Sequence, residues 1–356
     1  MERETTEQGR EQQAADAAWM RLAVEEAYKG YGTTSPNPPV GAVIVKDGRL
    51  IGIGHHEKAG EPHAERMALA DARAKGNEVL LEGATIYVTL EPCSSYGRTP
   101  PCTEAIIEAK LGRVVYGAVD PDERHRGRAD ALLSAAGILT HHGVENAACG
   151  LLLRSWAYAV QNRRPWITAK IAMTMDGRLT RRNTRWLSNE ETLTNAHRMR
   201  LRSDAIVTGG NTLRTDDPSL TIRLLDREEI PPCKEQPWRI VLTHSAAALP
   251  RDRKIFSDAY ADRTLVFENI TDWETWLTRL YEERGIVNLM LECGGKLLRP
   301  FFEHNLVNEC LFDIAPILGG GNDLALPGDF LPIERRFHME ERREVAGNTL
   351  LRGTVS

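Results

Sequence analysis

The sequence predicts two α/β domains in tandem. Strand-like and helix-like segments alternate twice along the chain, in two series separated by a helical stretch near residue 155. The length of 356 residues accommodates two domains at roughly 150 residues each. Hydrophobic residues make up 42% and charged residues 27%, values typical of globular proteins, which excludes the disordered and fibrous classes.

Charge and hydropathy narrow the possible partners. Lys and Arg number 45 against 50 for Asp and Glu, a net charge of −5, so we expect no nucleic-acid partner. No apolar run reaches the roughly 20 residues that span a bilayer, and residues 1–18 lack the apolar core of a secretory signal, so we expect a cytoplasmic protein away from membranes. In that reducing compartment the six cysteines are expected to be thiols or metal ligands, without disulfides.

The first alternating series occupies residues 16–145, after a polar lead-in at residues 1–15 for which we predict disorder. Apolar residues then recur at helical spacing from Trp19 until glycines stop the helix at Gly30. A Lys-Asp-Gly turn at 46–48 between two apolar runs predicts a hairpin. The predicted strands are 40–45, 50–53, 85–89, 114–118 and 138–141, and the predicted helices are 62–74, 101–109 and 129–136. This alternation predicts one sheet covered by helices on both faces.

A helical connector at residues 146–164 leads to the second series, at 165–356. Its predicted strands are 166–172, 205–208, 239–243, 264–267, 287–292 and 310–314, and its predicted helices are 189–201, 272–283 and 295–303. The same alternation predicts a second α/β domain.

The sharpest chemical pattern is His63 and Glu65 followed by Cys93 and Cys102. Imidazole and thiolate ligands suit zinc, and three protein ligands leave a fourth position for water. His63 and Cys102 fall at helix starts, where partial positive charge favours a thiolate. Glu65 is too near His63 to be an obvious ligand and is better placed to take a proton from zinc-bound water and pass it to a leaving amine. The alternative is a structural zinc site, which usually shows four ligands.

The spacing of the two cysteines is unusual. Nucleobase deaminases place two residues between their cysteines, whereas here eight residues, 94–101, intervene. This insertion brings Arg98 near the mouth of the site, where it could hold a phosphate or remain a solvated charge. The other four cysteines, Cys149, Cys233, Cys293 and Cys310, are predicted to be core or loop residues.

The second domain offers weaker signals. Gly294 and Gly295 lie between a strand and a helix, which suits a diphosphate resting on helix N–H groups, although a simple turn is the alternative. The segment lacks the Gly-x-Gly-x-x-Gly fingerprint, so a Rossmann domain is not predicted. Basic residues at 181, 182 and 185 could attract a cofactor phosphate or form a solvated face.

Three segments resemble a known family: Thr-Ser-Pro-Asn-Pro-Pro-Val-Gly at 34–41, Gly-Glu-Pro-His-Ala-Glu at 60–65, and Thr-Leu-Glu-Pro-Cys with Gly-Arg-Thr-Pro-Pro-Cys at 89–102. They resemble the bifunctional deaminase-reductases of riboflavin biosynthesis. The resemblance implies a cytidine-deaminase-like three-layer domain followed by a dihydrofolate-reductase-like α/β domain. It also implies zinc-dependent deamination of 2,5-diamino-6-ribosylamino-4(3H)-pyrimidinone 5′-phosphate, then NADPH-dependent reduction of its ribosyl group to ribityl, by a homo-oligomer.

The resemblance carries roles onto individual residues. His63, Cys93 and Cys102 would hold zinc and Glu65 would move the proton. Contacts to the deaminase substrate would come from Asn37, Arg98 and Asp120. Contacts to the reductase substrate would come from Lys170, Thr184, Arg200, Leu220, Arg223 and Glu292, and contacts to the cofactor from Trp186, Thr212, Asp216, Gly294 and Gly295.

This chain departs from the family pattern at four places. Ser95 stands where the family usually has histidine, and Asp122 stands where it tends to have asparagine, so an extra carboxylate would repel a substrate phosphate. In the second domain the departures are the Asn-Thr-Arg segment at 183–185 and the Thr-His pair at 243–244. Two alternatives therefore stay open: an active deaminase whose degenerate second domain serves dimerisation or binding, and a deaminase for a related pyrimidine or a nucleic-acid base.

Overall fold

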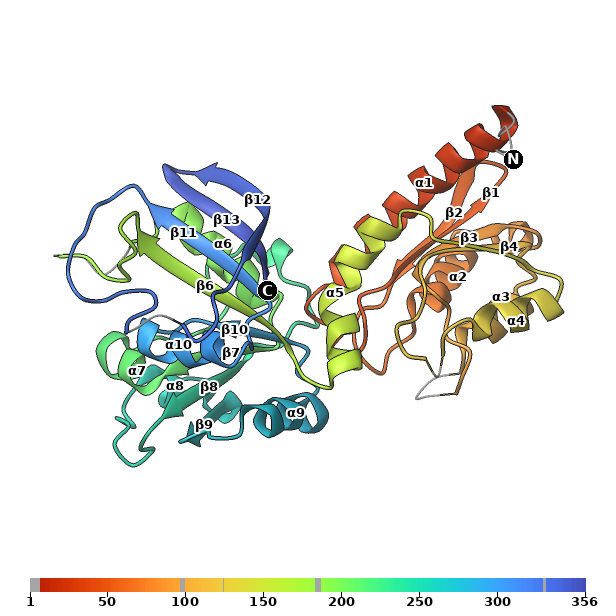
Figure 1. Cartoon of the computed structure of the whole chain (residues 1–356). Helices are drawn as coiled ribbons and strands as arrows, with labels where there is room; N and C mark the ends of the chain where they lie inside the picture. Colours follow the sequence, from red (N-terminus) through yellow and green to blue (C-terminus); the bar gives the residue numbers. More distant parts are fainter. Residues whose placement is uncertain (1–6, 97–99, 124, 183–186, 329–330) are drawn as a thin grey trace. The chain divides into compact units, whose positions relative to one another are not determined.

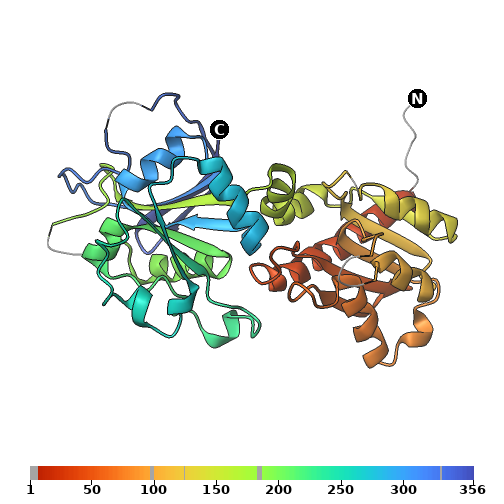
Figure 2. The ribbon, with the colours of Figure 1, turned by 90° about the horizontal axis from the view of Figure 1, so that it is seen from below.

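Two compact units make up the chain in this computed structural model, which describes residues 7–96, 100–123, 125–182, 187–328 and 331–356. The first unit spans Met1–Asn162 and the second Arg163–Ser356. Each is built on one β-sheet with helices on both faces (Figures 1 and 2), which confirms the predicted α/β class. Among the helices described, none is long and apolar enough to cross a membrane.

A five-stranded sheet forms the centre of the first unit. Its strands are β1 (Gly41–Lys46), β2 (Arg49–His55), β3 (Thr85–Leu90), β4 (Arg113–Ala118) and β5 (Leu139–His142), in the spatial order β2-β1-β3-β4-β5. β1 is antiparallel to β2 and β3, whereas β3, β4 and β5 are parallel. Asp47 and Gly48 both have positive φ, the backbone geometry of a tight hairpin turn. The predicted hairpin is therefore confirmed.

Helices on both faces of this sheet give the first unit three layers. They are α1 (Glu7–Ala27), α2 (Ala64–Ala74), α3 (Cys102–Glu108), α4 (Arg128–Ala135) and α5 (Asn146–Asn162). On one face Val43 and Tyr87 of the sheet pack against Met20 of α1 and Cys149 of α5. On the other face α2 lies so close to β2 that a Cβ at Gly54 would come within 2.6 Å of it. α3 contacts α2 and α4, so the helix starts that carry the predicted ligands lie on one side of the sheet.

The two ends of the first unit differ from the prediction. Disorder is predicted for residues 1–15, yet α1 begins at Glu7. Its first turns are rich in Glu, Gln, Ala and Arg, which favour helix even where they are exposed. The helix therefore extends toward the N-terminus beyond its buried part, which begins at Asp16. Residues 146–164, predicted to be a connector, largely form α5, which packs on the first sheet through the buried Cys149. The division between the units falls after α5.

Eight strands form the sheet of the second unit. They are β6 (Trp166–Thr174), β7 (Ala205–Gly209), β8 (Trp238–Thr243), β9 (Thr264–Glu268), β10 (Asn288–Leu291), β11 (Glu309–Ala315), β12 (Phe337–Val345) and β13 (Asn348–Val355), in the order β12-β13-β11-β6-β10-β7-β8-β9. From β11 to β9 all neighbours are parallel. β13 and β12 extend this sheet with antiparallel pairs.

Helices cover both faces of the second sheet, as parallel crossovers require. They are α6 (Glu190–Leu201), α7 (Gly210–Asp216), α8 (Lys254–Ser257), α9 (Trp273–Arg284) and α10 (Gly295–Glu303). Trp276 of α9 and Phe301 of α10 belong to the core on one face, whereas Leu213 of α7 and Ile255 of α8 belong to the core on the other. The side chain of Asn189 caps α6 by accepting a backbone N–H, so that predicted helix start is confirmed.

The hairpin of β12 and β13 is absent from the sequence-based prediction. Five of the nine residues of β12 are charged and most of the strand is exposed, so it lacks the apolar alternation by which strands are recognised. Its turn, Ala346 and Gly347, has positive φ at both residues, and alanine is an unusual residue for that conformation. β12 becomes a strand because β13 supplies its hydrogen-bonding partner.

Candidate active sites

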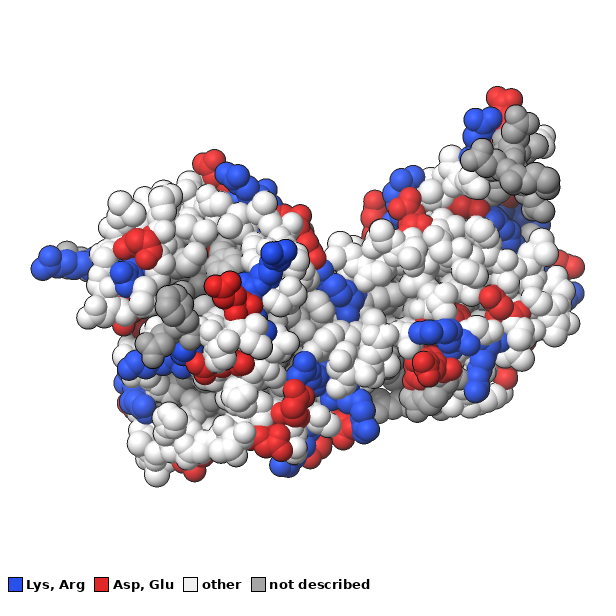
Figure 3. All heavy atoms as spheres, viewed as in Figure 1, with Lys and Arg blue, Asp and Glu red and all other residues white. Residues whose placement is uncertain are grey.

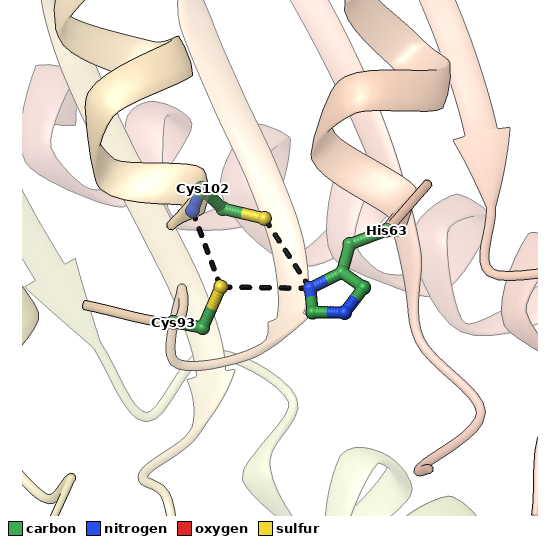
Figure 4. A group of neighbouring side chains, drawn as sticks. All are labelled: His63, Cys93 and Cys102. Atoms are coloured by element: carbon green, nitrogen blue, oxygen red, sulfur yellow. Dashed lines mark hydrogen bonds between the residues drawn. The ribbon is translucent and has the colours of Figure 1, made fainter. Parts of the chain in front are cut away.

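Two helix starts and one loop bring the predicted zinc ligands together in the first unit (Figure 4). His63 is the N-terminal cap of α2, Cys102 is the first residue of α3, and Cys93 lies in the loop after β3. Proline stands just before each helix, at Pro62 and Pro101. It is tolerated there because the first N–H groups of a helix have no partner within the helix. Local sequence therefore sets the position of two ligands.

The three ligand atoms are spaced as a zinc ion requires. Both sulfur atoms lie 3.5 Å from Nδ1 of His63, and all three atoms lie within 4.8 Å of one another. In a tetrahedral site with Zn–S of about 2.3 Å and Zn–N of about 2.05 Å, sulfur and nitrogen would be about 3.6 Å apart. The donor set and its spacing therefore fit one zinc ion with a fourth position for water.

Hydrogen bonds within this cluster favour the thiolate form of Cys93. Its sulfur accepts the backbone N–H of Cys102 at 3.2 Å, and its contacts with Cys102 and His63 hold the pKa of Cys93 well below the ordinary value despite burial. The contact with Cys93, together with burial, raises the pKa of Cys102. Two neighbouring thiols oppose each other's ionisation, so a cation is needed to make both thiolates.

Glu65 lies in the first turn of α2, two residues after His63, and its side chain is buried. Burial, and secondly the negative charge of Cys93, raise the pKa of the Glu65 carboxyl group. A carboxyl group with a raised pKa can both take up and release a proton during one reaction cycle. The position and the protonation behaviour both suit a proton carrier.

Asn37 is held by a histidine that the sequence analysis did not single out. Its Nδ2 lies 3.0 Å from Nε2 of His56, whose Nδ1 lies 3.0 Å from the carbonyl oxygen of Pro62. Because a carbonyl only accepts, Nδ1 carries the ring hydrogen and Nε2 accepts from Asn37. Burial lowers the pKa of His56 to about 4, which keeps the ring neutral. His56 also packs edge-on against His63, and its place seven residues before that ligand is the only sequence signal.

Asp120 begins a loop after β4 that Glu91 fixes in place. The buried carboxylate of Glu91 accepts the backbone N–H groups of Asp120, Gly127 and Ala129 at 3.2, 3.1 and 3.3 Å. The Asp120 carboxylate in turn accepts the N–H of Asp122 at 2.8 Å, and burial raises its pKa. The loop at 120–127 is therefore tied to the residue that precedes Pro-Cys in the zinc motif.

Charged side chains from three elements meet in the second unit. Arg200 of α6 donates to both carboxylate oxygens of Glu292, at 2.6 and 2.7 Å. Lys170 of β6 lies level with Glu292 because β6 and β10 are adjacent and Ala169 pairs with Leu291. Burial would raise the pKa of Glu292, but Arg200 and Lys170 lower it. Burial lowers the pKa of Lys170, and Glu292 opposes that shift. Three of the predicted substrate residues thus form one cluster.

The segment at 219–223 adjoins this cluster. Leu220 is buried with a φ of 51°, a left-handed conformation that is uncommon for a bulky residue. Its neighbour Thr221 accepts a hydrogen bond from Arg200 through its carbonyl oxygen at 2.9 Å. Burial and the charge of Arg200 lower the pKa of Arg223, whose backbone N–H donates to His197 at 3.1 Å. Leu220 and Arg223 therefore belong to the same site.

Asp313 of β11 is a charged member of this site that the sequence did not reveal. It is buried, and its carboxylate accepts from the Ser188 hydroxyl at 2.5 Å and from the Asn348 amide at 2.6 Å. Its charge also acts on Lys170. An aspartate within an apolar strand carries no recognisable motif, so only the pairing of β11 with β6 shows its role.

Four of the five predicted cofactor residues lie at the start of α10 and in α7. Gly294 caps α10, and a Cβ on Gly295 would come within 2.2 Å of the carbonyl oxygen of Leu324, so only glycine fits there. The Thr212 hydroxyl lies 4.0 Å from the point that a Cβ of Gly294 would occupy, and Asp216 ends α7 one turn later. Helix N–H groups beside a hydroxyl suit a diphosphate.

Three predicted site residues, Arg98, Thr184 and Trp186, lie outside the described residues. The departures at 183–185 are likewise outside them.

Comparisons with known proteins match both units. Residues 13–118 match the family model of the cytidine and deoxycytidylate deaminase zinc-binding region, and residues 165–344 match that of the RibD C-terminal domain. The riboflavin biosynthesis protein RibD of Aquifex aeolicus is 37% identical over 86% of this chain and 88% of its own length. The Escherichia coli RibD is 34% identical over 94% of this chain and 98% of its own length.

Solved structures give the same result. Acinetobacter baumannii RibD is 32% identical, with a TM-score of 0.86 over 97% of this chain and 99% of that one. A Thermotoga maritima protein described as a diaminohydroxyphosphoribosylaminopyrimidine deaminase/5-amino-6-(5-phosphoribosylamino)uracil reductase is 30% identical, with a TM-score of 0.85 over 96% of this chain and 99% of that one. The predicted order, a deaminase-like domain followed by a reductase domain, is confirmed.

Proposed function

The chain belongs to the RibD family of riboflavin biosynthesis proteins, and on that premise we propose the reaction of each unit. It is a bifunctional deaminase and reductase of riboflavin biosynthesis. The first unit deaminates 2,5-diamino-6-ribosylamino-4(3H)-pyrimidinone 5′-phosphate with the help of zinc. The second unit reduces the ribosyl group of the product to ribityl with NADPH.

One observation carries the deaminase assignment: two sulfur atoms and Nδ1 of His63 spaced for zinc, with the buried Glu65 two residues away. His63, Cys93 and Cys102 would hold zinc, which would supply a water molecule of lowered pKa. Glu65 takes a proton and delivers it to the leaving amine, and its raised pKa suits both transfers. Asn37 gives an N–H to His56, so its amide oxygen is left to accept a hydrogen bond from the pyrimidine.

The charged cluster of the second unit supports the reductase reaction. Its three cations, Lys170, Arg200 and Arg223, face two carboxylates, Glu292 and Asp313, so the cluster attracts a phosphorylated substrate. NADPH, when bound, supplies the hydride. The N–H groups at the start of α10 would hold its diphosphate, and Thr212 and Asp216 would contribute further contacts to the cofactor. Two hydrogen bonds to Glu292 hold the Arg200 guanidinium group in position before substrate binds.

The test follows both products from purified, zinc-loaded protein given the phosphorylated diaminopyrimidinone with and without NADPH. We expect ammonia release in both cases and NADPH oxidation only once deaminated substrate is present. Removal of zinc with a chelator should abolish ammonia release and leave the reduction of deaminated substrate unchanged. Ammonia release from zinc-free protein would contradict the deaminase proposal, and failure to oxidise NADPH with deaminated substrate would contradict the reductase proposal.

The charge distribution favours a small phosphorylated substrate over a polynucleotide. On the face that Figure 3 shows, acidic and basic side chains are interspersed over both units, in keeping with the net charge of −5. A nucleic-acid enzyme would instead gather basic groups into a continuous track along the backbone. Single-stranded DNA or RNA should therefore not compete with the pyrimidine substrate at physiological salt, which a competition assay measures.

A further inference from the structure

A serine and a histidine from different loops meet at the rim of the deaminase site. Ser95 lies two residues after the zinc ligand Cys93, and its hydroxyl oxygen is 3.3 Å from Nδ1 of His125. His125 lies 30 residues further along the chain, in the loop after β4. Both side chains are partly exposed, so they face the solvent-accessible side of the site. Ser95 is also the position at which the family usually carries histidine.

Described residues on both sides of His125 are hydrogen-bonded to Glu91. Glu91 accepts a backbone N–H near each end of the loop, from Asp120 and from Gly127, and the N–H of His125 itself donates to the carbonyl oxygen of Asp122 at 2.9 Å. Because Glu91 precedes Pro92 and Cys93, the same residue ties both loops to the end of β3. The contact between Ser95 and His125 is therefore a product of the local framework.

The chemistry of the pair suits an anion. With Nδ1 of His125 accepting the Ser95 hydroxyl hydrogen, the neutral ring carries its own hydrogen on Nε2 and can donate it. Among the residues that the structure describes, none makes a hydrogen bond to this Nε2. In its protonated form, the His125 imidazolium lowers the pKa of Asp120, so that form offsets part of the negative charge of the loop.

We propose that His125 supplies, from the loop after β4, the imidazole that this chain lacks at Ser95, and that it recognises the phosphate of the deaminase substrate. The proposal rests on the proposed deaminase function. Deamination requires the pyrimidine at the zinc site, and the phosphate is at the other end of the ribose, so a group that binds it must lie near that site without being part of it. Ser95 and His125 meet that condition, because Ser95 is two residues from Cys93 and contacts His125. His125 is thus a specificity-determining residue, and it counteracts the repulsion expected from Asp122.

The test compares His125→Val, the double variant Ser95→His/His125→Val and the control His141→Val, which changes an exposed histidine of β5. Each is assayed for deamination of the phosphorylated substrate and of its dephosphorylated form, with zinc content and thermal unfolding measured in parallel. We expect His125→Val to raise KM about tenfold for the phosphorylated substrate, the effect of losing one hydrogen bond to a charged group. KM for the dephosphorylated form, kcat and zinc content should change little.

The double variant makes the test decisive because it returns the imidazole to the other loop. We expect it to restore most of the lost affinity, and His125→Gln, which keeps an N–H donor, to lose less than His125→Val. An unchanged KM in His125→Val, an equal rise for both substrates, or a folded double variant without recovery would each overturn the proposal. Should His125→Val not fold, His125→Gln, assayed with both substrates, still decides the question. If the wild type does not deaminate at all, the proposed function fails, and that outcome is distinct from failure of this inference.

Discussion

The two sites differ in how their charges are balanced before any ligand arrives. In the first unit, two thiol groups and one imidazole lie close together, and a cation is needed to balance two thiolates. The pKa of Cys93 is lowered, whereas the pKa of Cys102 is raised. In the second unit, Arg200 already neutralises Glu292 through two short hydrogen bonds. The first site is therefore expected to depend on a bound cation, whereas the second is held together by its own residues.

The two sites should therefore respond differently to the loss of one side chain. Loss of a group at the first site should abolish chemistry and leave the fold intact, because α2 and α3 are packed independently of zinc through buried residues such as Leu69 and Ile106. Loss of a group at the second site should affect stability as well, because it leaves a buried partner uncompensated.

The largest effect is expected from Glu65→Gln, which should lower kcat for deamination about a thousandfold, since the proton carrier is lost. Zinc content and NADPH oxidation with deaminated substrate should stay at wild-type levels. Metal analysis and the two activity assays measure this. Glu61→Gln, an exposed neighbour, is the matched control, and deamination by Glu65→Gln at the control's rate would refute the role of Glu65.

Glu292→Ala should abolish reduction and also destabilise the second unit by about 3 kcal/mol, because Arg200 would remain buried without its partner. Deamination by the same protein should continue. Differential scanning calorimetry together with both activity assays measures this. A stable Glu292→Ala protein with an unchanged unfolding profile would show that the pair serves substrate binding alone.

A smaller effect is expected at the anchor of α1, where Asp16 accepts two hydrogen bonds from Arg113 and one from Tyr87. Burial would raise the pKa of Asp16, but these hydrogen bonds lower it below its usual 3.8. Because the pKa of Asp16 is lower in the folded state, its ionised carboxylate stabilises the fold at pH values above 3.8. That stabilisation is lost as the pH falls from 3.8 through the folded-state pKa.

Asp16→Asn should therefore lower the stability of the first unit by about 2 kcal/mol at pH 7 and weaken its dependence on pH below 4. Urea unfolding of both proteins from pH 7 to pH 3 measures this. An equal loss of stability on acidification in the two proteins would contradict the role of Asp16.

The smallest effect is expected from Asp122→Asn, which removes one carboxylate from the loop at 120–127. KM for the phosphorylated deaminase substrate should fall about twofold to threefold, because a screened like charge repels the phosphate only weakly. KM for the dephosphorylated substrate should not change. A higher KM in the variant would show that Asp122 assists binding.

The sequence predicted the first site more completely than the second for a physical reason. His63, Cys93 and Cys102 lie within 40 residues of one another, and imidazole and thiolate in that pattern have few uses besides binding a metal. Lys170 and Glu292 are common residue types 122 positions apart, and only the pairing of β6 with β10 brings them together. The family resemblance identified them as site residues, whereas their residue types alone gave no reason to choose them.

Elements were predicted where the hydrophobic pattern was strong. β3 and β4 are buried along almost their whole length and were found, whereas the charged and exposed β12 was missed because its stability comes from pairing with β13. The helical start of α1 was missed for a related reason, since helix propensity can order residues whose polarity predicts disorder.

By itself the sequence determined the α/β class and the presence of two units, and it predicted zinc ligands that the fold brings together and a proton carrier beside them, because these depend on local periodicity and on rare ligand chemistry. Only the tertiary structure decided which charges neutralise each other, that His56 orients Asn37, that Asp313 lies beside Lys170, and that His125 meets Ser95. Those contacts join residues far apart along the chain, and electrostatic and hydrogen-bond energies depend on distances that only the packed sheet and its loops define.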